Sequence, residues 1–228
     1  MGKFIGFPII RQKFKRMKTR NIFAVACIAL VSAAFTVETP DDKAGLKIGD
    51  KLPMAETDMK ATDGTATNLT KLMGKKGLVV VFSCNTCPFV VGSESFAGWE
   101  VQYNALHQLA KDSNIGFVLV NSNAAKRTGD DSMEAMITRA SEKAYTMPYL
   151  VDENAALADA FGAKTTPHVY FFNENSELIY QGAIDNTVDG KRKEDKNYLQ
   201  QAMRDHLAGK KVSEKTTPPR GCSIKRVS

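Results

Sequence analysis

Histidine and cysteine are scarce in this chain, whose 228 residues include three histidines and four cysteines. A structural zinc site needs four such ligands, usually in closely spaced pairs. Only Cys84 and Cys87 form such a pair. The other candidates show no matching spacing: His107, His168, His206 and Cys222. The sequence therefore predicts no metal site, and we expect no bound cofactor.

The N-terminal part of the chain also lacks a hydrophobic run long enough to cross a membrane. Its apolar run, residues 22–31, falls short of the ~20 residues that a span needs. The run follows a basic stretch and precedes small residues, the pattern of a cleavable signal peptide. We expect residues 1–34 to be this signal, with Met17 as the true start, and the mature chain to be periplasmic or otherwise exported. An uncleaved membrane anchor and a lipoprotein at Cys27 are the alternatives.

The excess of positive charge is confined to that segment. Seven of the 31 Lys and Arg residues lie in residues 1–33, which contain no acidic residue, so 24 basic residues face 25 acidic ones in the rest of the chain. A nucleic-acid-binding surface needs its positive charge on the folded domain. The balance therefore argues against nucleic acid as a partner.

Removal of the signal would leave three cysteines, an odd number for an exported protein. Cys84 and Cys87 are the natural pair, which makes Cys222 the spare thiol. Cys222 could reach the pair on its tail as a second resolving thiol, be exposed and idle, or be buried by a docked tail. A position on the tail shows that Cys222 could reach the pair, but not that its side chain would have the distance and orientation that a disulfide needs. The sequence therefore favours no catalytic role for Cys222.

The pair follows an apolar, β-branched run, residues 78–82, which predicts a buried strand. Pro88 suits the first turn of a helix, so the two cysteines lie where a strand turns into a helix. The free N–H groups and the dipole of a helix start favour a thiolate. We expect Cys84, at the exposed end of the turn, to be the nucleophile and Cys87 to be the resolving thiol.

This arrangement resembles the thioredoxin-like redoxins. Their cis-proline before a strand is matched by Thr166-Pro167, which precedes the apolar residues 169–172. The resemblance covers roughly residues 46–209. It implies a cis peptide bond there, with the backbone of Thr166 offered to a substrate chain. The residues inside and beside the motif that we expect to line the substrate are Asn85, Thr86, Pro88, Thr166 and Pro167.

Three departures from related families matter. Thioredoxin has a buried aspartate six residues before the first cysteine, where this chain has Leu78. Peroxiredoxins have a threonine three residues before their reactive cysteine, where this chain has Val81, so peroxidase chemistry is disfavoured. Copper-assembly relatives have three residues between the cysteines. The tail sequence 221–225 resembles one found in some bacterial redoxins.

The remaining patterns predict one α/β domain, residues 49–209, with a thioredoxin-like mixed sheet, helices on both faces and an N-terminal β-hairpin. The hairpin spans 54–68 and residues 71–77 form a connection. Further strands are expected at 115–120, 149–151, 169–172 and 178–181. Helices are expected from the cysteines to about 110, then near 131–144, 152–161 and 193–208, with Asp131 and Asp152 as caps. Residues 35–48 read as a linker and 210–228 as a flexible basic tail.

Three functions remain open at this point. The first is a periplasmic thiol–disulfide oxidoreductase, whose partners would be protein or small-molecule thiols and disulfides and a redox partner protein. The second is a peroxiredoxin-like thiol peroxidase. The third is a non-enzymatic module that binds copper or a thiol protein.

Overall fold

The computed structural model describes residues 1, 2 and 45–227. The signal peptide, the start at Met17, Cys27 and the linker up to residue 44 lie outside the described residues. Residues 45–48, which we expected to belong to the linker, are part of the domain. Leu46 is half-buried, donates its N–H to the carbonyl of Phe161 and accepts from the side chain of Gln181.

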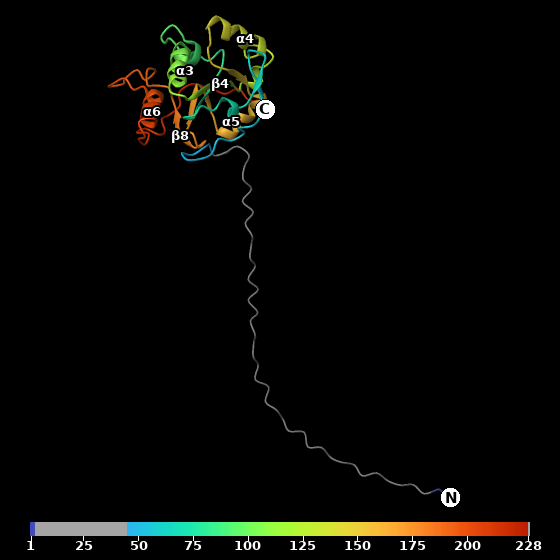
Figure 1. Cartoon of the computed structure of the whole chain (residues 1–228). Coiled ribbons are helices and arrows are strands. Elements are labelled where there is room, and N and C mark those ends of the chain that lie inside the picture. Colours follow the sequence, from blue (N-terminus) through green and yellow to red (C-terminus); the bar gives the residue numbers. More distant parts are fainter. Residues whose placement is uncertain (3–44, 228) are drawn as a thin grey trace. The chain divides into compact units, whose positions relative to one another are not determined.

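The centre of the domain is a five-stranded sheet in the order β5-β4-β3-β7-β8 (Figure 1). Strand β3 (Leu78–Ser83) pairs in parallel with β4 (Gly116–Asn121) and antiparallel with β7 (His168–Phe172). Strand β5 (Tyr149–Val151) is parallel to β4, and β8 (Leu178–Gly182) is antiparallel to β7. The predicted mixed α/β sheet is therefore confirmed.

Strand β3 is buried along its whole length because both faces of the sheet are covered. Its side chains alternate between two apolar cores, as the period of a strand requires. Val79 and Val81 pack with α3 (Tyr103–Asp112), α4 (Met133–Glu142) and α6 (Tyr198–Leu207). Val80 and Phe82 pack on the other face with α1 (Leu69–Leu72) and α5 (Ala156–Phe161).

Local capping explains several boundaries that the sequence did not predict correctly. We expected residues 71–77 to be a connection, but residues 71 and 72 belong to helix α1. The N-cap of this helix, Asn68, accepts a hydrogen bond from the N–H of Lys71. Helix α4 is capped by Ser132 and not by Asp131. Asp152 does accept the N–H groups of α5, as expected.

Helix α6 begins at Tyr198, later than predicted. The hairpin strands are β1 (Met59–Lys60) and β2 (Ala66–Thr67).

The helix expected after the cysteines is broken into three pieces. They are α2 (Pro88–Val91), the 3-10 helix η1 (Trp99–Gln102) and α3. Gly92 and Gly98 have φ of 97° and 77°, a region that favours glycine. A Cβ on Gly98 would lie 2.3 Å from the carbonyl oxygen of Val90. The break therefore depends on glycine, and it lets the chain fold back beside the motif.

The C-terminal tail is docked on the domain, so the expectation of a flexible segment is wrong. Val212 and Ile224 are buried in the two cores. Backbone hydrogen bonds join Gln181 in β8 to Lys215 and Thr217. Strand β9 (Cys222–Ser223) pairs antiparallel with β6 (Thr165–Thr166). The basic, proline-containing composition concealed these apolar anchors, and the domain therefore extends beyond residue 209.

No helix in the part of the chain that the structure describes is long and apolar enough to span a membrane.

The short 3-10 helices η2 (Ala124–Lys126) and η3 (Glu153–Ala155) follow β4 and β5. They lie at the carboxyl ends of these parallel strands, as the cysteines do at the end of β3.

Candidate active site

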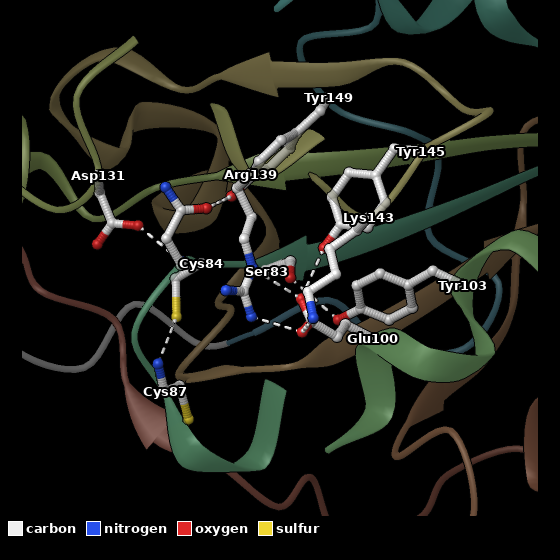
Figure 2. A network of polar contacts seen from close by, with 11 residues as sticks. Ser83, Cys84, Cys87, Glu100, Tyr103, Asp131, Arg139, Lys143, Tyr145 and Tyr149 are labelled. Atoms are coloured by element: carbon white, nitrogen blue, oxygen red, sulfur yellow. Dashed lines mark hydrogen bonds and ion pairs between the residues drawn. The ribbon is translucent and has the colours of Figure 1, made fainter. Parts of the chain in front are cut away.

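The two cysteines of the motif lie at the carboxyl end of β3, on the turn that leads into α2. The backbone N–H of Cys87 donates to the Sγ atom of Cys84 over 3.4 Å (Figure 2). Each cysteine is only 3% exposed. The expectation that Cys84 is exposed is therefore wrong for this structure. The turn places the pair as predicted, but other parts of the chain cover it.

Thr166 touches both sulfurs. Its hydroxyl lies 3.1 Å from the Sγ of Cys84, and its carbonyl oxygen accepts a hydrogen bond of 3.1 Å from the Cys87 thiol. The peptide bond between Thr166 and Pro167 is cis, the form that the resemblance implied. A stretch 79 residues beyond the motif is thus part of the same site.

The docked tail covers the site from the other side. Cys222 lies opposite Thr166 in the pairing of β9 with β6. The backbone N–H of Cys222 donates to the Sγ of Cys87 over 3.2 Å. Of the three alternatives for this cysteine, the structure shows the docked tail, with the side chain half-buried. The tail occupies the backbone edge that the resemblance assigned to a substrate chain.

The other predicted substrate-binding residues lie at the surface of the turn. Thr86 and Pro88 are exposed. Asn85 is half-buried, and its amide oxygen accepts from the hydroxyl of Tyr149 over 3.0 Å. Pro88 lines a cavity of about 430 Å³ together with Phe89 and Phe96. These positions surround the covered sulfurs.

Asp131 holds the turn in place, a role that the sequence analysis missed. This fully buried carboxylate accepts from the N–H of Asn85 over 2.8 Å and from the side chains of Asn121 and Asn123. The partners are up to 46 residues apart in sequence, so no local pattern could reveal them. The charge of Asp131 also raises the pKa of Cys84.

The pKa values of the two motif cysteines shift in opposite directions. The pKa of Cys87 is lowered to about 5, first by the Cys84 side chain and then by the thiol and the N–H of Cys222. The Cys87 side chain, followed by burial, raises the pKa of Cys84. These directions are the reverse of the charge placement expected from the motif, and the Cys84 side chain contributes more to the shift of Cys87 than either group of Cys222 does.

Beside the pair lies a buried polar cluster, also drawn in Figure 2. Glu100, 4% exposed, accepts from Arg139 and from the hydroxyl of Tyr145, each over 3.0 Å. The hydroxyl of Tyr103 lies 3.0 Å from that of Ser83, the residue before Cys84. Burial raises the pKa of Tyr103 and of Tyr145, so both phenols stay neutral. The cluster anchors η1 and α4 against the end of β3.

His168 follows Pro167 and is buried, with its Nδ1 3.3 Å from the hydroxyl of Tyr170. It lies in β7, and the described hydrogen bonds include none between it and either cysteine. Burial, and then the charge of Lys164, lowers its pKa to about 4.

The low pKa of His168 leads to a pH-dependent stability. The unfolded chain protonates this histidine near pH 6.5 and the folded chain only near pH 4, so its contribution is complete above pH 6.5 and is lost as the pH falls to 4. The loss is about 3 kcal/mol at most. We expect the free energy of unfolding, measured with urea, to fall more steeply between pH 7 and 4 for the wild type than for His168→Gln. Equal slopes would contradict the pKa shift.

No group of three metal-ligating side chains within residues 45–227 is arranged to hold a metal ion.

Residues 47–201 match the family model described as Redoxin, and the chain belongs to this family. An uncharacterized conserved protein from Geobacillus kaustophilus is 30% identical, with a TM-score of 0.71 over 79% of this chain and 93% of that one. A hypothetical protein from Sinorhizobium meliloti 1021 is 27% identical, with a TM-score of 0.67 over 81% and 97%. None of the curated proteins compared matches.

The thioredoxin-like fold is supported by a more distant structure, a putative thiol:disulfide interchange protein DsbE from Chlorobium tepidum. It is 16% identical, with a TM-score of 0.53 over 72% of this chain and 99% of that one. At this identity the likeness concerns the fold alone. The predicted fold class and family are thus confirmed.

Proposed function

We propose that this redoxin is a thiol–disulfide oxidoreductase and that Cys84 and Cys87 are its catalytic pair. The observation that carries the proposal is the joint contact of both sulfurs with Thr166, 3.1 Å from each, beside a 3.4 Å hydrogen bond between the two residues. Cysteines at this spacing on one turn, both in contact with the same residue, are placed to form a disulfide with each other. Their position beside the backbone of Thr166 would let a substrate chain reach them once the tail is displaced.

The reaction proceeds by two exchanges. The Cys84 thiolate attacks one sulfur of a substrate disulfide, forms a mixed disulfide and releases the other substrate sulfur as a thiolate. Cys87 then attacks the Sγ of Cys84, which breaks the mixed disulfide and releases the second substrate thiolate. The products are a substrate dithiol and a Cys84–Cys87 disulfide. An oxidised enzyme runs the same steps in reverse.

Displacement of the tail activates Cys84 in this scheme. Without the tail, Cys87 loses the N–H of Cys222 but keeps the carbonyl of Thr166, which accepts a hydrogen bond only while Cys87 is protonated. Cys84 keeps two donors, the hydroxyl of Thr166 and the N–H of Cys87. A substrate chain that takes the place of the tail therefore removes a hydrogen-bond donor from Cys87 and none from Cys84.

The proposed setting is the periplasm, and it rests on the pattern of residues 1–34 alone. The proposed partners are protein or small-molecule disulfides and a redox partner that supplies or removes electrons. Asn85, Thr86, Pro88, Thr166 and Pro167 are the proposed substrate contacts, since they surround the sulfurs.

Turnover of insulin disulfides with dithiothreitol as electron donor tests this function. The chain is expected to bring forward the precipitation of the insulin B chain in proportion to its concentration. A time course that matches dithiothreitol alone at every concentration would contradict the proposal.

A further inference from the structure

Cys87 lies between two thiols, one on each side. Cys84 is its partner in the motif, and Cys222 approaches from the tail. The backbone nitrogen of Cys222 is 3.2 Å from the Sγ of Cys87, and the Cys222 thiol is among the groups that lower the pKa of Cys87. The three described cysteines are all free thiols in this structure. The motif alone does not account for this third sulfur.

The tail holds Cys222 in this place through contacts on both sides of it. Gly221, the residue before Cys222, lies so close to Thr166 that a Cβ atom added to Gly221 would be 2.1 Å from the carbonyl oxygen of Thr166. After Cys222, Ile224 is buried and donates its N–H to Lys164 over 3.0 Å. The N–H of Lys225 donates to the side chain of Asn123 over 2.9 Å. A thiol held in this way reacts as if at a very high local concentration.

We propose that Cys222 is a third exchange cysteine, which takes over the disulfide of the catalytic pair by attacking Cys87. The Cys222 thiolate forms a bond to the Sγ of Cys87, the Cys84–Cys87 bond breaks, and Cys84 leaves as a thiolate. The proton lost by Cys222 balances the one gained by Cys84. No external oxidant is needed, because the proposed function supplies the Cys84–Cys87 disulfide on which this inference rests.

The exchange would carry the disulfide toward the surface. Cys84 and Cys87 are each 3% exposed, whereas Cys222 is half-buried. A Cys87–Cys222 disulfide therefore offers an external thiol a more accessible sulfur. It also fixes the tail over the site until a reductant, a small thiol or a dithiol protein, attacks Cys222.

Disulfide mapping of two variants tests the pairing. Cys84→Ser and the matched control Cys87→Ser each keep Cys222 and one motif cysteine. After equilibration of the full chain in glutathione buffers, mass spectrometry of peptides is expected to show a Cys87–Cys222 link in Cys84→Ser, at least tenfold more abundant than any Cys84–Cys222 link in Cys87→Ser. The wild type is expected to show both the Cys84–Cys87 and the Cys87–Cys222 links.

The outcomes separate this inference from the proposed function. Insulin turnover by the wild type, without a Cys87–Cys222 link in the wild type or in Cys84→Ser, would overturn the role of Cys222 alone. A Cys87–Cys222 link in a chain that does not turn over insulin would overturn the proposed function and leave the pairing standing. Equal links from Cys222 to both motif cysteines would show a freely moving tail, and this would overturn the proposal.

Discussion

Replacement of Cys84 by serine is expected to reduce insulin turnover to the uncatalysed rate, a loss of about a thousandfold or more. A serine hydroxyl stays protonated near neutral pH and cannot form the mixed disulfide. Cys87→Ser is expected to keep the first exchange and to stall after it, because nothing in the motif remains to resolve the intermediate. Mass spectrometry is therefore expected to find substrate bound to Cys84 in Cys87→Ser.

The same two variants separate the reductase from a peroxidase. A peroxidase would still consume hydrogen peroxide in Cys87→Ser and would lose this activity in Cys84→Ser. The expected result is no peroxide consumption above the rate of an ordinary thiol in any of the three proteins. Wild-type insulin turnover that persists in Cys84→Ser would contradict the assignment of the nucleophile.

Replacement of Gly221 by valine is expected to open the site. The new side chain would collide with the carbonyl of Thr166, which a Cβ alone would approach to 2.1 Å. A clash that costs the docked tail about 2–3 kcal/mol raises the open fraction by roughly 30- to 150-fold. Alkylation of Cys84 by iodoacetamide is expected to accelerate by a similar factor. The five-stranded sheet does not include this segment, so the fold is expected to persist.

Gly129→Ala is the matched control for that experiment. The only atom within 4 Å of a Cβ at Gly129 is a carbonyl oxygen at 4.0 Å, and this glycine is not in the left-handed region. We expect its alkylation rate to equal that of the wild type. Equal rates in Gly221→Val and the wild type would show that the tail does not limit access to the sulfurs.

The sequence was informative where local chemistry decides the structure. The short run of apolar, β-branched residues at 78–82 allowed the central strand to be recognised. The spacing of Cys84 and Cys87 before Pro88 identified the turn. Thr166-Pro167 could be placed beside them only through the family resemblance, because no local pattern joins segments 79 residues apart.

The missed features all depend on contacts between distant segments. Asp131 resembled a helix cap, but its carboxylate is held by Asn85, Asn121 and Asn123, which the fold brings together. The tail looked flexible by composition, yet a few apolar residues and one strand pairing hold it in place. The Sγ of Cys84 is contacted by Thr166 and that of Cys87 by the N–H of Cys222, so the burial of the pair could not be inferred from the motif.

The thiol–disulfide equilibrium of the motif tests the central claim most directly. The wild-type chain is equilibrated in glutathione buffers across a wide range of potentials, acid-quenched and alkylated, and the state of each cysteine is read by mass spectrometry. The expected result is a two-electron transition in which Cys87 loses its free thiol to an internal disulfide, with Cys84 or, after the exchange, Cys222 as its partner. Separate glutathione adducts on each cysteine, or thiols that stay free at every potential, would contradict it.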